Sequence, residues 1–225
     1  MSEAPGWAAI DGALRPLYGD TEPVRWANDQ PWSGGGDPLD GVSAYPRLDP
    51  VPHWHYISYG MTELYEKEWD SQEVSGWGFE FTFRLLRDPG DTEPPRWPVT
   101  FAQNLAGYVF QSGKVFEPGQ AIKANGPIAE GHRDSAIHAV CFTADPELGT
   151  IDTPHGGVRF LQIVGLTMPE YRTARGRRER GLELLNRLAP QLPLFVTDIR
   201  RGPLVPEPKP EASWPRWGGG LRGRG

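Results

Sequence analysis

Two histidines, His53 and His55, are the first side chains in this sequence whose types and spacing could do chemistry. They open the run His53–Gly60, whose aromatic and β-branched residues predict a β-strand. Alternate side chains of a strand point to one face, so both imidazoles would lie together, as two metal ligands do. A third ligand would have to come from His132, His138 or a carboxylate. Packing of both histidines against the neighbouring aromatic rings is the other interpretation.

Three further patterns could carry catalysis, and each has a simpler explanation. Cys141 could pair with a histidine as nucleophile and base, but its apolar neighbours predict a buried strand, where a thiol is inert. The carboxylates within residues 63–70 are typical of a solvated face. The glycines at 34–36 and 156–157 lack the strand–loop–helix context and the Lys-Ser/Thr pair of a phosphate-binding loop. We therefore predict no catalytic centre and no cofactor.

A basic run at residues 172–180 contains five arginines. It could bind phosphate or an acidic partner, it could join the Arg-Gly tail in contacting nucleic acid, or it could be a solvated connection between helices. Overall the charge is −6, and residues 1–171 alone carry 11 Lys/Arg against 24 Asp/Glu, a net of −13. This acidic balance argues against a general nucleic-acid binder and suits the steering of a basic protein partner.

Hydrophobic periodicity predicts the helices that must position these groups. The residues from Trp7 to Tyr18 have helical spacing, and Pro16 is expected to break that helix before its end. Thr62–Lys67 is expected to be a short polar helical stretch. Pro98–Ser112 should form a helix that Gly113 ends. Two more helices are expected. One should begin after Thr167, and the other should contain the leucines at 182–188.

Alternation and apolar runs predict the strands. Gly78–Leu85 alternates between large apolar and polar residues, which indicates one buried face and one wet face. Ile137–Thr143, Val158–Leu166 and Leu194–Ile199 are expected to be strands as well. Because strands and helices do not alternate strictly, we expect an α+β fold with a mainly antiparallel or mixed central sheet flanked by helices.

Composition and chain order suggest the domain organisation. A helical segment at 1–22 should pack on a domain at 23–202, and the Pro/Gly/Arg-rich tail at 203–225 is expected to be disordered. A single cysteine fits a reducing compartment. We find no signal-peptide pattern in Met1–Pro5 and no apolar stretch of the length that a membrane span needs, so we expect a cytoplasmic protein without membrane contact.

Several segments, in order from about Trp7 to Gly202, resemble the Suppressor of fused domain. The matching segments are Trp32–Tyr45, His53–Gly60, Gly76–Leu85, Pro95–Pro98, Tyr108–Ser112, Thr153–Pro154, Phe160–Gly165 and Thr197–Arg201. The resemblance implies an α/β domain that binds protein partners without catalysis. In animals the family member grips a short extended peptide, which adds as a strand between this domain and a second one. The chain ends soon after Arg201, so the second domain is expected to be missing.

The resemblance also implies partner-binding residues. Two groove positions carry over by identity, Tyr108 and Phe116. The acidic positions of the groove fall on Gln120 and Ala144, so a cationic group of a partner would meet no carboxylate there. Tyr108 lies on the stripe of the predicted helix and could equally be core, whereas Phe116 is expected to be exposed.

We therefore expect a non-catalytic partner-binding protein, bacterial and of the single-domain type, with an immunity or regulatory role. Its partner would be a protein, either a basic toxin or a peptide segment added as a strand, and not nucleic acid or membrane. The alternative is a metal-binding module or metal-dependent enzyme centred on His53 and His55.

Overall fold

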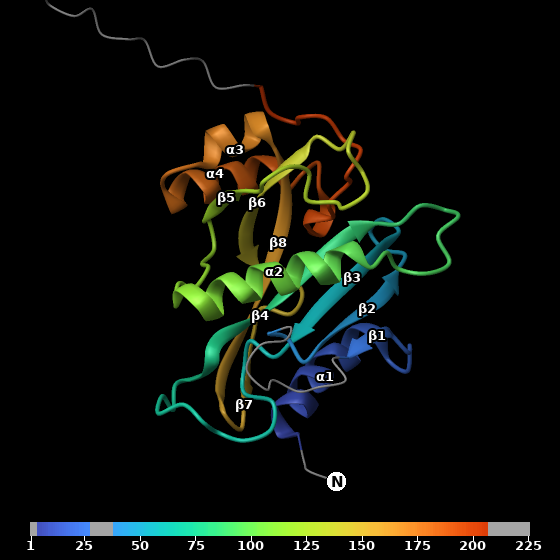
Figure 1. Cartoon of the computed structure of the whole chain (residues 1–225). Helices are drawn as coiled ribbons and strands as arrows, with labels where there is room; N and C mark the ends of the chain where they lie inside the picture. The colour runs from blue at the N-terminus through green and yellow to red at the C-terminus, as the bar shows by residue number, and fades with distance from the viewer. Residues whose placement is uncertain (1–3, 28–37, 207–225) are drawn as a thin grey trace, which may run out of the picture.

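One mixed sheet organises the computed structural model, which describes residues 4–27 and 38–206 (Figure 1). Its strands are β1 (Val24–Ala27), β2 (Gly41–Arg47), β3 (His53–Tyr59), β4 (Val74–Leu86), β5 (Ala121–Lys123), β6 (Ile137–Ala144), β7 (Thr150–Thr153) and β8 (Gly156–Thr167). The order is β1-β2-β3-β4-β8-β6-β5, with β7 paired to β8. The β4–β8 pair is parallel and the other pairs are antiparallel. The predicted α+β class with a mixed sheet is confirmed.

Helices cover both faces of this sheet. They are α1 (Pro5–Tyr18), α2 (Trp97–Ser112), α3 (Met168–Ala174) and α4 (Arg178–Leu188), and a short 3₁₀ turn follows at Pro193–Phe195. None of them, within the part of the chain described, has the length and apolarity needed to cross a bilayer.

Helix α2 covers one face, as its apolar spacing predicts. Leu105 and Val109 are buried against the phenylalanines of β4 and their neighbours in the main core. Pro98 lies in the first turn, where its missing N–H costs no helical hydrogen bond. Gly113 ends the helix in the left-handed conformation, at φ 69°, and donates its N–H to the Val109 carbonyl. The predicted start and end are both confirmed.

The opposite face carries two apolar clusters with a polar strip between them. Helix α1 packs Ile10 and Leu14 over the β2–β3 end, and α3 and α4 pack over the β6–β8 end. The β4 residues Glu80, Thr82 and Arg84, which face the strip, are at most 1% exposed. The prediction of a wet face on β4 was therefore wrong, because other segments bond to these polar groups and exclude water from them.

Two helix predictions also need correction. Thr62–Lys67 is an irregular segment with bends instead of a helix, because the Glu63 carboxylate accepts the backbone N–H groups of Trp69 and Gly76 at 2.7 and 3.0 Å. Such local bonds to the backbone compete with a helical ladder. Pro16 does not break α1, which continues to Tyr18. Pro16 lies in the last turn, where it removes only one helical bond.

The predicted last strand, Leu194–Ile199, is not formed. Pro193–Phe195 is a 3₁₀ turn in which Leu194 and Phe195 have positive φ, and this conformation does not fit a strand. Only Thr197 pairs, in a single parallel bridge with Leu85. The turn-rich stretch at 28–37 and the tail from 207 to 225 lie outside the described residues.

A close contact between two glycines docks α4 on the sheet. A Cβ atom added to Gly181 would meet the carbonyl oxygen of Gly119 at 1.9 Å, whereas one added to Gly107 of α2 would meet nothing within 4 Å. Gly181→Ala should therefore lower the free energy of unfolding by about 1–3 kcal/mol through overpacking. Gly107→Ala is the matched control and should raise it by up to about 1 kcal/mol. Urea denaturation measures both, and equal effects would contradict the glycine contact.

Candidate functional site

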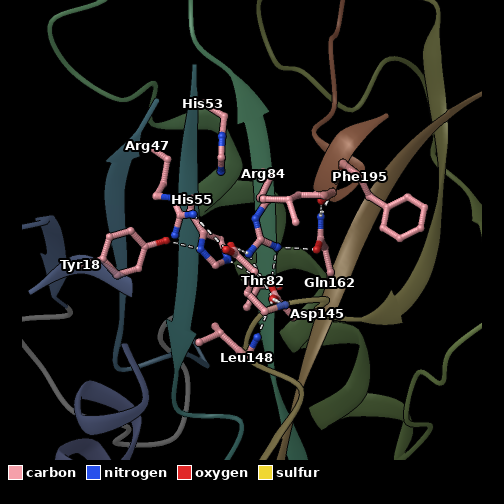
Figure 2. A network of polar contacts seen from close by, with 12 residues as sticks. Tyr18, Arg47, His53, His55, Thr82, Arg84, Asp145, Leu148, Gln162 and Phe195 are labelled. Carbon is pink, nitrogen blue, oxygen red and sulfur yellow. Dashed lines mark hydrogen bonds and ion pairs between the residues drawn. The ribbon is translucent and has the colours of Figure 1, made fainter. Parts of the chain in front are cut away.

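His55 lies in the middle of a buried chain of hydrogen bonds (Figure 2). The Tyr18 hydroxyl is 2.5 Å from Nδ1 of His55, and Nε2 is 3.2 Å from Oδ2 of Asp145. An ionised carboxylate only accepts, so Nε2 carries the proton and Nδ1 accepts from Tyr18. His53 is on the same face, as predicted, and its Nδ1 donates to the Val51 carbonyl at 2.7 Å.

Asp145 is the last acceptor in this series of hydrogen bonds. It is 2% exposed, and its two carboxylate oxygens accept from His55 Nε2, Thr82 Oγ1, Arg84 Nη1 and Nη2, and the backbone N–H groups of Glu147 and Leu148. Burial alone would raise the pKa of Asp145, but the bonds from His55 and the charge of Arg84 hold it well below its usual range. Burial, reinforced by Arg84, lowers the pKa of His55 to about 3.

Arg84 extends the network across the sheet. Besides Asp145, its guanidinium donates to Gln162 Oε1 at 2.6 Å and to Glu147 Oε2 at 2.9 Å. Gln162 in turn donates to the Leu194 carbonyl at 2.8 Å, which holds the 3₁₀ turn against β8. The network therefore connects α1, β3, β4, β8 and the loop after β6 in one buried unit (Figure 2).

This geometry does not support the metal hypothesis. Both ring nitrogens of His55 already have protein partners, and Nδ1 of His53 is engaged too. His138 bonds to the Ser135 carbonyl through Nε2, and His132 is exposed. Within residues 4–27 and 38–206, no three His, Cys, Asp or Glu side chains gather as metal ligands. His55 is a structural group in the network, and His53 is a buried group on the same face that bonds to the Val51 carbonyl, which is close to the packing interpretation.

Removing the charge of Asp145 should be costly, because it leaves Arg84 buried without its main counter-ion. We expect Asp145→Asn to lower the free energy of unfolding by about 3–5 kcal/mol. Asp134→Asn, at an exposed position, is the control and should change it by less than about 0.5 kcal/mol. Chemical denaturation at pH 7 provides the measurement. A loss below 1 kcal/mol for Asp145→Asn would show that the network is not essential.

His53 should make stability depend on pH. Burial lowers the pKa of His53 to about 4 from 6.5, so between pH 7 and 5 the unfolded chain takes up a proton that the folded one does not. The wild type should thus lose about 2 kcal/mol from this residue as pH falls. His53→Asn retains a donor for the Val51 carbonyl but does not titrate. As the pH falls from 7 to 5, the free energy of unfolding of His53→Asn should therefore rise by about 2 kcal/mol relative to that of the wild type. A constant difference would contradict it.

A second candidate site is the outer edge of β5. Among the residues that the structure describes, this strand ends the sheet and pairs only with β6. Phe142 donates its N–H to the Gln120 carbonyl, and Ala124 donates to the His138 carbonyl. In an antiparallel ladder the bonded residues alternate, so the N–H and C=O groups of Ala121 and Lys123 point away from β6. An unpaired edge of this kind can accept another strand.

The three predicted contact residues lie at the start of this edge. Tyr108 projects from α2, is 47% exposed, and stacks on Phe116 with ring centroids 5.5 Å apart. Phe116 is only 5% exposed and stacks on Phe142 at 4.4 Å, so the prediction that it is exposed was wrong. The ring of Phe116 therefore lies between the rings of Tyr108 and Phe142 and packs on both. Gln120 immediately precedes β5, and its Oε1 accepts the N–H of Glu117 at 3.3 Å.

Sequence reasoning missed other residues at this edge. Val115 and Leu182 are 43% and 40% exposed, and Leu182 lies next to Gly119, just before β5. Strand β5 has only three residues, too few for an alternation signal.

The arginines at 175, 177, 178 and 180 are exposed, and Arg178 pairs with Glu117. Cys141 is fully buried, as predicted, and burial raises the pKa of its thiol to about 12.

Comparison with known proteins agrees with this fold and with the motifs. Residues 35–202 match the family described as Suppressor of fused protein. The chain belongs to the Suppressor of fused family. It is 39% identical over 219 residues to the Suppressor of fused homologs of Homo sapiens and Mus musculus. The match covers 91% of this chain and 45% of each relative, so the chain spans about half the length of these curated relatives.

Solved structures of the family have the same fold. A chain in the crystal structure of the Sufu–Fu complex aligns with a TM-score of 0.81 and 32% identity, covering 89% of this chain and 93% of that one. Drosophila Suppressor of fused gives 0.80 and 32%, covering 89% and 51%. A Suppressor of fused homolog from Neisseria gonorrhoeae shares the fold, with a TM-score of 0.58 and 15% identity over 88% and 96%.

Proposed function

We propose that this protein binds a protein partner by accepting an extended segment as an additional strand on β5. The observation that carries the proposal is the free edge of β5 beside an exposed aromatic ring, Tyr108. Backbone hydrogen bonds to Ala121 and Lys123 would supply affinity, and flanking side chains would supply selectivity. The Sufu–Fu complex supports this, since a relative of this chain is known in a complex.

The described groups favour binding over catalysis. His55 and Asp145 are paired as in many hydrolases, but both are at most 2% exposed and no substrate could reach them. The thiol of Cys141 is buried in the core between the sheet and α4. We therefore propose a binding protein with no catalytic activity and no cofactor.

A regulatory or immunity role, in which the protein sequesters its partner in a bacterial cytoplasm, is the finer part of the proposal. Residues 1–171 carry a net charge of −13, which favours encounter with a basic protein such as a toxin. The same charge disfavours nucleic acid. Co-expression with candidate toxins tests this role separately from strand addition, and rescue of growth is the expected result.

One backbone atom distinguishes strand addition from other modes of binding. The N–H of Lys123 points to the free edge, so Lys123→Pro removes a donor for an added strand without breaking the β5–β6 ladder. The control Lys123→Thr keeps the N–H and removes only the charge. Tagged variants are compared by quantitative mass spectrometry of proteins that co-purify from the source cells. We expect at least a tenfold loss of the partner with Lys123→Pro and near wild-type recovery with Lys123→Thr. Equal recovery would contradict strand addition.

Tyr108 should contribute to the same contact. Truncating this exposed ring removes apolar area beside the edge, and Tyr108→Ala should weaken partner binding about tenfold while changing the unfolding free energy by less than about 1 kcal/mol. Tyr65→Ala removes a similarly exposed tyrosine, 41% against 47%, on the loop after β3 and is the matched control. If both variants bind equally well, the contact lies elsewhere.

A further inference from the structure

A hollow of about 560 Å³ lies between the loop that joins β3 to β4 and the last turn of α2. The aromatic residues Trp69, Trp77 and Phe110 belong to its described lining, and no residue of the β5 edge does. Phe110 follows Tyr108 by two positions, so the two side chains project from nearly opposite sides of α2. The hollow is therefore separate from the proposed site of strand addition.

The charge of this hollow has one sign. Within the part of the chain that the structure describes, its lining contains no lysine or arginine and four carboxylates, those of Asp40, Glu63, Glu66 and Glu68. Lys67 neutralises only Glu63, to which its ammonium donates at 2.7 Å, and its other two bonds go to backbone carbonyls. Burial raises the pKa of Asp40, and no cation offsets this effect. A positively charged group that enters the hollow would supply the missing counter-charge.

Glu63 fixes the loop that carries Trp69. Its carboxylate accepts the backbone N–H groups of Trp69 and Gly76, at 2.7 and 3.0 Å. Burial alone would raise the pKa of Glu63, but the bonds from Lys67 and from the backbone lower it to about 2, so this carboxylate is ionised at neutral pH. The loop is thus held in place without a ligand, which lowers the entropy cost of binding one.

The aromatic rings indicate which cation fits. Trp69 is 42% exposed, and its ring meets that of Trp77 edge to face, with centroids 5.0 Å apart and planes at 70°. Trp77 meets Phe110 in the same manner, at 5.5 Å and 63°. Rings in direct contact leave no space between them for a bulky trimethylammonium group, whereas a flat group can lie on the exposed ring of Trp69. Among the described residues the carboxylates do not gather as metal ligands either.

A guanidinium has the matching shape and charge. It is flat, it stacks on aromatic rings, and its N–H groups donate to carboxylates along its edge. A lysine ammonium is compact and strongly hydrated, so it gains less from such a ring. Free arginine would bring its own carboxylate among those of the lining, and like charges repel. An arginine within a peptide chain carries no such charge.

We infer that this hollow is a binding site for an arginine side chain of a protein partner. The guanidinium would stack on Trp69 and pair with the carboxylates of the lining, of which Asp40 is the most buried without a described counter-ion. The inference goes beyond strand addition on β5 and does not require it.

Small probes test the site on the whole protein. They are acetyl-arginine amide, acetyl-citrulline amide, acetyl-lysine amide and free arginine, and citrulline has the shape of arginine without its charge. We expect acetyl-arginine amide to shift the indole N–H signals of Trp69 and Trp77 in ¹H–¹⁵N spectra saturably, and to bind about fivefold or more tightly than each other probe. Trp69→Phe and Trp77→Phe assign the two signals.

Each alternative result overturns a defined part of the inference. Without a saturable shift there is no site. Equal binding of the citrulline probe would overturn the role of charge, and equal binding of the lysine probe would overturn the choice of a guanidinium. Equal binding of free arginine would overturn a peptide as its source.

Two pairs of variants locate the contacts. Asp40→Asn should weaken binding of acetyl-arginine amide about fivefold or more, whereas Asp70→Asn, at an exposed position of the same loop outside the described lining, should change it by less than about twofold. Trp69→Leu keeps an apolar side chain without an aromatic ring and should also weaken binding about fivefold, whereas Trp69→Phe should stay within about twofold of wild type. Equal effects within either pair would contradict the contact concerned.

The outcomes separate this inference from the proposed function. Lys123→Pro should leave binding of acetyl-arginine amide unchanged, and its loss would overturn a separate site. A partner that is lost with Lys123→Pro, together with no binding of the arginine probe, would leave strand addition intact and overturn the hollow. Binding of the probe to a protein whose partner is indifferent to Lys123→Pro would do the reverse.

Discussion

The ion pair between Arg84 and Asp145 is the interaction on which this architecture depends. β4 is a long strand near the middle of the sheet, and a guanidinium buried there needs compensation from every side. Asp145 and Glu147 of the loop after β6, together with Gln162 of β8, accept hydrogen bonds from its two terminal nitrogens, and these bonds fix the loop and β8 against β4. The network fills the strip between the cluster under α1 and the cluster under α3 and α4. Two apolar half-cores are thereby joined by a polar centre.

This arrangement explains why we place the proposed binding site at an edge of the sheet. The centre of the sheet is covered on one face by α2 and closed on the other by the Arg84 network, so no partner can reach it. β5 is attached through β6 alone and is supported from one side by Phe116 on Phe142 and from the other by the Gly119–Gly181 contact. A short strand held this firmly presents its outward N–H and C=O groups without needing to be ordered first, which lowers the entropy cost of binding.

Sequence patterns predicted those parts of the fold whose reasons are local. The proline and glycine that bound α2 and the family motifs act within a few residues. The wet face of β4, the exposure of Phe116 and the strand at Leu194–Ile199 were predicted wrongly, because each is decided by distant segments. Arg84 looks like a surface residue in an alternating strand until Asp145, 61 positions later, is placed against it. The free edge of β5 is equally invisible, since it depends on which strand ends the sheet.

Charge and hydrogen bonding have separate tasks in such a protein. An acidic body would raise the rate of encounter with a basic partner of the proposed kind, but its field is screened within about 8–10 Å at cellular salt. At the β5 edge Glu117 pairs with Arg178, whereas the arginines at 175, 177 and 180 leave exposed positive charge nearby. Gln120 and Ala144 stand where the resemblance to the family implies acidic groove residues, so these two positions add no negative charge. In the proposed mode of binding, discrimination between partners would come from backbone pairing and from the ring of Tyr108, which depend on register where charge does not.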